Sequence, residues 1–73
     1  MENLFVLFMS DRLVGVYTSH RKATQTMMLD TIRDNLKLDS YSYSFGVEFF
    51  SYLDTDGNEI VWEIQEVTPD NRV

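Results

Sequence analysis

The chain has 73 residues, of which 44% are hydrophobic and 14% aromatic, and six basic against twelve acidic residues give a net charge of −6. This length accommodates a single domain, and this hydrophobic content excludes a disordered chain. The acidic balance argues against direct nucleic acid binding, and the absence of cysteine excludes disulfides, thiolate metal sites and thiol catalysis.

Residues 3–18 are predicted to form a β-hairpin. The apolar run at residues 4–9 has the length of a strand, Ser10-Asp11-Arg12 is typical of a turn, and residues 13–18 are again rich in β-formers. Gly15 inside the second strand indicates a bulge or a close backbone approach. The apolar start has no basic residues ahead of it and charges soon follow, so we expect neither a signal peptide nor a membrane span.

Residues 19–37 are predicted to form a helix, because this stretch contains neither proline nor glycine. Ser19 is suited to capping the first turn, since its hydroxyl can accept from an exposed backbone amide. We expect the helix to pack on the sheet through an apolar stripe spaced at three and four residues, formed by Met28, Leu29, Ile32 and Leu36.

Residues 41–68 are predicted to form a second hairpin, followed by a polar tail at residues 69–73. Apolar and polar residues alternate from Tyr41 onward, and a change of phase near Phe49-Phe50 is interpreted as a bulge. Asp56-Gly57 can adopt the positive φ values of a tight turn between the two strands. The last strand then runs from residue 59 to about residue 67.

These elements predict an α+β fold of ββαββ type, with one helix packed on one face of a four-stranded antiparallel sheet. One helix covers one sheet face only, whereas several strands carry apolar residues on both faces. We therefore expect exposed aromatic side chains on the uncovered face, an interface there, and a homo-oligomer.

No residue pattern points to an enzyme, a cofactor or a metal site. His20 is the only histidine, and no carboxylate lies at helical spacing to orient it, so we interpret it as a solvated side chain. The segment starting at Asp54 has the alternating oxygen ligands of a calcium loop. However, Gln65 stands at the twelfth position, where such a loop needs glutamate.

The surface predictions concern charge and aromatic residues. An acidic ridge on the helix and a last strand rich in glutamate are explained first by solubility, and a protein partner with a basic surface is the alternative. The candidate interaction surface consists of Asp30, Asp34, Tyr43, Phe45, Glu59, Trp62 and Glu63. Ser19, Arg21 and Lys22 are a weaker candidate for an anion site at the helix N-terminus, where a simple cap is the favoured interpretation.

The sequence resembles small phage and prophage accessory proteins in two segments. Residues 14–23 combine a strand ending in Gly-Val-Tyr with a helix that begins Ser-His-Arg-Lys-Ala, and the Asp56-Gly57 turn is followed by Trp62-Glu63-Ile64. The resemblance implies a phage-encoded protein that binds and inhibits a host or defence protein in the host cytoplasm. A cysteine-free small domain also suits a reducing compartment. A small-ligand-binding oligomer and a nucleic acid mimic are the alternatives.

Overall fold

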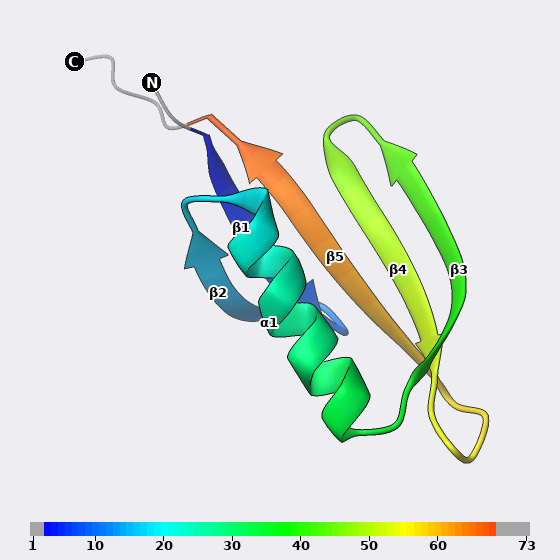
Figure 1. Cartoon of the computed structure of the whole chain (residues 1–73). Coiled ribbons are helices and arrows are strands. Elements are labelled where there is room, and N and C mark those ends of the chain that lie inside the picture. The colour runs from blue at the N-terminus through cyan, green and yellow to red at the C-terminus, as the bar shows by residue number, and fades with distance from the viewer. Residues whose placement is uncertain (1–2, 69–73) are drawn as a thin grey trace.

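The computed structural model describes residues 3–68 as an α+β domain with one helix and one antiparallel sheet (Figure 1). In chain order the elements are β1 (Leu4–Met9), β2 (Arg12–Tyr17), α1 (His20–Arg33), β3 (Lys37–Ser44), β4 (Val47–Leu53) and β5 (Glu59–Val67). The strands lie in the order β2-β1-β5-β4-β3. The α+β class is confirmed, but the sheet has five strands rather than four, because the predicted second hairpin is a three-stranded unit.

A tight turn at Phe45-Gly46 separates β3 from β4. Ser44 pairs with Val47 across this turn, and the two residues between them have φ angles of 51° and 78°. Two successive positive φ values are what a two-residue type I′ hairpin requires. The expected bulge near Phe49-Phe50 is therefore wrong: the alternation of side chains changes phase because the chain reverses direction.

The helix also ends earlier than the sequence predicts. Asn35 has a φ of 55°, and its backbone N–H donates to the carbonyl of Ile32 at 3.2 Å. The N–H of Leu36 donates to the carbonyl of Thr31 at 2.8 Å. These two bonds are the Schellman arrangement that terminates many helices. The predicted helix over 19–37 therefore stops short of Lys37, which begins β3 instead.

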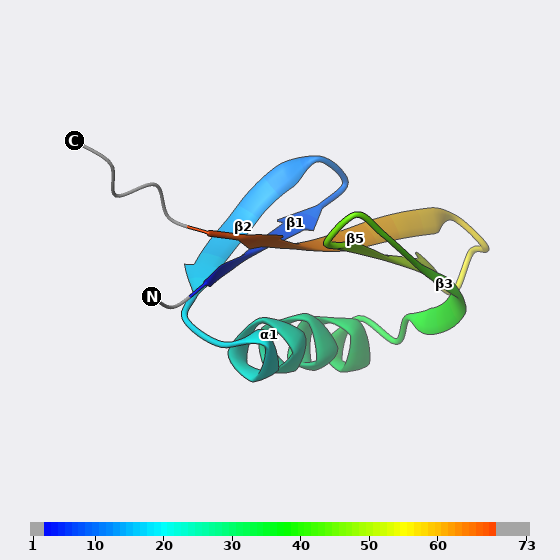
Figure 2. The ribbon, with the colours of Figure 1, turned by 90° about the horizontal axis from the view of Figure 1, so that it is seen from above.

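The helix lies on one face of the sheet (Figure 2) and packs mainly against β1, β2 and β5. Its buried residues are Ala23, Met27 and Thr31. The predicted packing stripe is therefore wrong for three of its four members, which are exposed by 48–69%: Met28, Leu29 and Ile32. Only Leu36, beyond the end of the helix, packs against the core. Large sheet residues such as Trp62 fill the layer, and the side of the helix that carries the small residue Ala23 is the buried one.

The hydrophobic core lies between α1 and the centre of the sheet. Its buried members are Leu7, Ala23, Met27, Tyr52, Trp62 and Ile64. The indole Nε1 of Trp62 is buried without a hydrogen-bond partner among the described residues. Strands β3 and β4 extend past the helix (Figure 1), so the helix-facing side of β3 stays open to solvent.

Strand β1 shows two local features, a register shift against β2 and a side-chain contact with the end of β5. The register of β1 with β2 shifts between Leu7 and Phe8, opposite the segment that holds Gly15, which confirms the predicted bulge. At the other side of β1, the Thr68 hydroxyl donates to the Asn3 side-chain carbonyl at 3.0 Å, so β1 begins beside the end of β5. The predicted polar tail at residues 69–73 lies outside the described residues.

Candidate interaction surface

Strand β3 is exposed along its whole length and forms one margin of the sheet. Among the described residues, no strand pairs with its outer edge. Residues paired across neighbouring strands project to the same face, and two such rows run outward from the core. One row joins Trp62, Phe50 and Tyr41, and the other joins Ile64, Glu48 and Tyr43. The inner ends of both rows are buried under α1, whereas both tyrosines are exposed.

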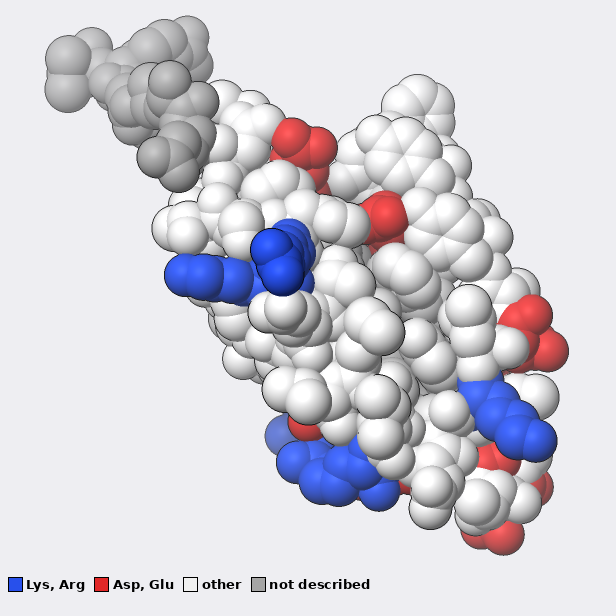
Figure 3. All heavy atoms as spheres, in the orientation of Figure 1, with Lys and Arg blue, Asp and Glu red and all other residues white. Residues whose placement is uncertain are grey.

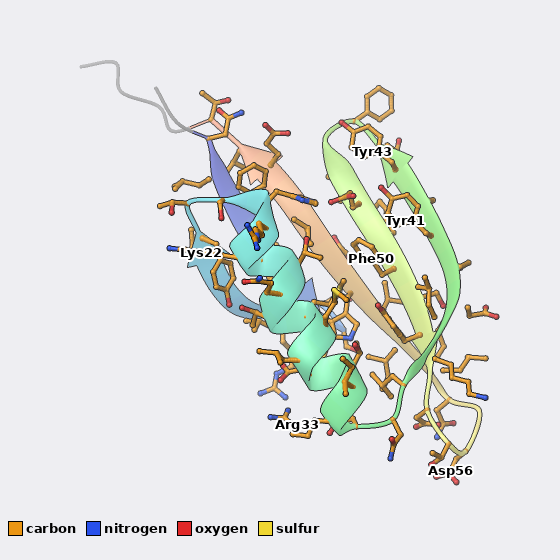
Figure 4. All side chains as sticks on the ribbon, viewed as in Figure 1. Lys22, Arg33, Tyr41, Tyr43, Phe50 and Asp56 are labelled. Carbon is orange, nitrogen blue, oxygen red and sulfur yellow. The ribbon has the colours of Figure 1, made fainter. Side chains whose placement is uncertain are left out.

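These aromatic side chains form a continuous group on the helix-facing side of the sheet. The rings of Tyr41 and Phe50 are 4.9 Å apart between centroids and tilted by 52°. Figure 4 shows Tyr41, Tyr43 and Phe50 together on β3 and β4, to one side of α1. The surface over this part of the hairpin is mostly uncharged, with acidic atoms beside it (Figure 3). We name Tyr41, Tyr43, Phe45 and Phe50 the aromatic arm.

Phe45 stands at the tip of the aromatic arm and is fully exposed. Its φ of 51° lies in the left-handed region, which bulky residues adopt rarely and at a cost. The first central position of a type I′ turn is usually asparagine, aspartate or glycine, which tolerate this conformation. Phenylalanine at this position therefore serves neither the turn nor the solubility of the domain.

A hydrogen-bonded chain of three side chains anchors the base of the arm. The Tyr41 hydroxyl donates to Oε2 of Glu48 at 2.6 Å, and Nε2 of His20 lies 2.5 Å from Oε1 of the same carboxylate. The hydrogen bond to Glu48, reinforced by partial desolvation and the negative charge of that carboxylate, raises the pKa of Tyr41. The His20 ring also makes an edge contact with the Phe5 ring, with 5.7 Å between the ring centroids. His20 thus links α1 to β4, a contact that local spacing could not reveal.

Ser19 is confirmed as the helix cap, with its hydroxyl accepting from the Lys22 N–H at 3.1 Å. The side chains of Arg21 and Lys22 are near this end of α1, but the Glu48 carboxylate lies there as well, against His20. The negative charge of this carboxylate repels an anionic ligand. The anion site suggested by the sequence gains no support from this geometry.

The other sequence-derived surface residues do not gather at one place. Trp62 is 1% exposed, so its inclusion in the interaction surface is wrong: alternation puts it on the face that α1 covers. The Arg33 guanidinium lies 3.0 Å from Oδ1 of Asp30 and 3.5 Å from Oδ1 of Asp34, so its positive charge offsets part of the negative charge of the predicted acidic ridge. Glu59 accepts a hydrogen bond from Ser51, and Glu63 pairs with Phe49 on the face opposite the helix.

The sheet face without a helix is only half-buried by its own side chains. Its partly exposed apolar residues are Leu4, Val6, Phe8, Val47, Phe49, Leu53 and Val61. The aromatic residues on this face, Phe8 and Phe49, are shielded more than Tyr41 and Tyr43. The most exposed aromatic side chains therefore belong to the aromatic arm rather than to the uncovered face, where the sequence suggested them.

A shallow, open hollow of about 350 Å³ lies on the outer side of α1. It is lined by Gln25, Met28, Leu29 and Ile32, all from the same helix. Small-molecule sites are generally concave and surround most of their ligand. Side chains of one exposed helix cannot do this, so the hollow gives no support to the ligand-binding alternative.

The turn between β4 and β5 is built around the carboxylate of Asp54. Its Oδ1 accepts from the backbone N–H groups of Asp56 and Asn58 at 2.9 and 2.8 Å, and Gly57 adopts a φ of 84°. The hydrogen bonds, with that from the Asn58 N–H foremost, lower the pKa of Asp54. The oxygens that resemble calcium ligands are thus explained by the turn. No cluster of three His, Asp or Glu side chains within residues 3–68 could hold a metal ion.

Comparison with family models, with curated protein sequences and with solved structures gave no match. Among the described residues, no helix has the length and apolar character needed to cross a membrane.

Proposed function

We propose that this chain is a protein-binding module whose contact surface is the aromatic arm. The observation that carries the proposal is Phe45, a fully exposed aromatic residue held at a positive φ at the tip of a hairpin. Backbone strain and local misfit between residue and structure concentrate at functional sites. Burial of this ring by a partner would explain why phenylalanine occupies an exposed position with a positive φ.

The chemistry of the arm defines the partner. Exposed tyrosine and phenylalanine are enriched at protein interfaces, because each covers a large area and loses little conformational freedom on binding. Glu48 adds negative charge next to Tyr41, within a chain of net charge −6. The partner is therefore a protein with an apolar pocket for Phe45 and basic side chains around it.

Inhibition of that partner, in the cytoplasm of a bacterial host, is the part of the proposal that rests on the resemblance to phage accessory proteins. The test begins with capture from a bacterial lysate by the wild-type chain and by two variants. Phe45→Asn removes the ring and relieves the turn, whereas Ile32→Ser changes an equally apolar, exposed side chain on α1. A protein retained by wild type and Ile32→Ser but lost with Phe45→Asn supports the proposal.

The purified partner then allows two further measurements. Its own activity in the presence of the wild-type chain separates inhibition from simple binding. Its association rate should fall as salt is raised toward physiological strength, where charges are screened beyond about 8 Å. A partner that binds Phe45→Asn as tightly as wild type would show that the aromatic arm is not the contact surface.

A further inference from the structure

Strand β3 carries a second property, which concerns its backbone edge rather than its aromatic side chains. In an antiparallel sheet, every second residue of a marginal strand directs its N–H and C=O groups away from its neighbour. Such an edge is a template for another strand unless charge, proline, a bulge or a covering element blocks it. The two outer strands of this sheet, β2 and β3, differ in this respect.

The β2 edge is blocked, whereas most of the β3 edge is open. β2 is interrupted by the bulge near Gly15 and carries Arg12 at its start. β3 has its irregularity and its two charges early, at Lys37 and Asp39. The remaining segment, residues 40–44, is uncharged, regularly paired with β4 and exposed at every position.

The sequence of this open segment is Ser-Tyr-Ser-Tyr-Ser, which reads the same in both directions. Two antiparallel copies centred on Ser42 therefore match residue for residue. Tyr41 of one copy lies opposite Tyr43 of the other on the helix-facing side, and serines face one another on the opposite side. Aromatic–aromatic and serine–serine cross-strand pairs are both stabilising in antiparallel sheets.

We infer that β3 pairs with β3 of a second copy of this chain, in antiparallel register about a two-fold axis through Ser42. The axis is perpendicular to the sheet, so both helices lie on the same side of one continuous sheet. The row of Trp62, Phe50 and Tyr41 then continues into Tyr43 of the partner copy. Helix α1 packs over β1, β2 and β5, so it does not obstruct this edge.

The pairing is independent of the proposed function, and salt separates the two. Each copy has a net charge of −6, so the two copies repel one another at long range. Screening weakens this repulsion, and self-association therefore strengthens as salt is raised. Binding to a basic partner changes in the opposite direction.

The absence of cysteine from the chain makes a direct test possible. Opposite Cα atoms in an antiparallel pair lie about 4.5 or 5.5 Å apart, both within the range that a disulfide spans. The variant Ser42→Cys should form a disulfide-linked dimer under mild oxidation. Val16→Cys, an exposed position on the blocked β2 edge, is the matched control and should remain mostly unlinked.

Charge variants at the same position test the two-fold axis itself. Ser42→Lys and Ser42→Glu each place like charges opposite one another and should sediment as monomers. A mixture of the two should recover the mass of a dimer, since only a residue on the axis meets its own equivalent. Equal cross-linking at positions 42 and 16, or a wild-type chain that stays monomeric at high concentration and high salt, would overturn the inference.

Discussion

The hydroxyl of Tyr41 on β3 and the carboxylate of Glu48 on β4 are joined by a 2.6 Å hydrogen bond on the open side of the sheet. Since the bond needs the protonated phenol, it raises the pKa of Tyr41 above its ordinary value of 10.0. The stabilising effect is complete below the ordinary pKa and is lost as pH rises through the higher folded value. Absorbance titration of the folded protein should therefore show one late-ionising tyrosine.

The variant Glu48→Gln should move the ionisation of Tyr41 back toward its usual range, because the negative acceptor is removed. Tyr41→Phe should remove the late-ionising group altogether. A late tyrosine that persists in Tyr41→Phe would assign the effect to a different side chain.

The packing of α1 predicts opposite results for two apolar residues. Met27 is 1% exposed and Ile32 is 69% exposed. Met27→Ala should lower the free energy of unfolding by about 2–5 kcal/mol, the usual range for emptying a core position. Ile32→Ala should change it by less than about 0.5 kcal/mol, as at other exposed sites. Urea unfolding of the two variants measures both values, and a reversed order would contradict the observed helix orientation.

The pKa of Asp54 predicts how the β4–β5 turn responds to acid. It lies below the ordinary value of 3.8, because the ionised carboxylate accepts hydrogen bonds from the turn. The resulting stabilisation is present above the ordinary pKa and is lost as pH falls through the lower folded value. Asp54→Ala should lower the melting temperature at neutral pH, and the difference from wild type should shrink in strong acid. A difference that does not depend on pH would exclude the charged form as the source.

The strained turn predicts a gain in stability at the expense of binding. Phe45→Asn places a residue that tolerates positive φ where the backbone requires it. Thermal unfolding should show a melting temperature higher by roughly 4 °C, the shift expected when a small domain is relieved of modest backbone strain. Gly46→Val is the opposite case and should lower the melting temperature, since Gly46 has a φ of 78°.

Trp62 offers a probe that separates folding from binding. It is the only tryptophan, and its side chain is buried beneath α1. Its fluorescence should shift to longer wavelength on unfolding and resist quenching by iodide in the folded state. Occupation of the aromatic arm by a partner should leave the emission maximum nearly unchanged, and a large change on binding would indicate that the core rearranges.

The sequence predicted the features that local chemistry determines. Ser19 marks the helix start, Asp56-Gly57 marks a turn, and Glu59–Val67 forms a strand as expected. The turn at Phe45-Gly46 was missed because its first residue is one that turns disfavour. Asn35, which tolerates the left-handed conformation, was the available indication that the helix ends before Lys37.

The remaining errors concern contacts between distant parts of the chain. The predicted helix stripe was chosen for apolarity, but the sheet beneath α1 already supplies bulky groups such as Trp62, and the small face of Ala23 fits better. Glu48 reaches His20 from 28 positions away in sequence, which no helical spacing predicts. The aromatic arm could be anticipated in part, since Tyr43 and Phe45 were among the candidate residues.

The contact between Asn3 and Thr68 has a practical consequence. The start of β1 and the end of β5 are adjacent, and they lie at the same end of the sheet as the β3–β4 turn (Figure 1), where the Glu66 N–H donates to the Gly46 carbonyl at 3.0 Å. Structured regions with neighbouring ends can be inserted into a surface loop of another protein, or joined end to end and reopened elsewhere. A carrier attached at these two points would therefore lie beside the Phe45 tip, so linkers are needed to keep the aromatic arm accessible.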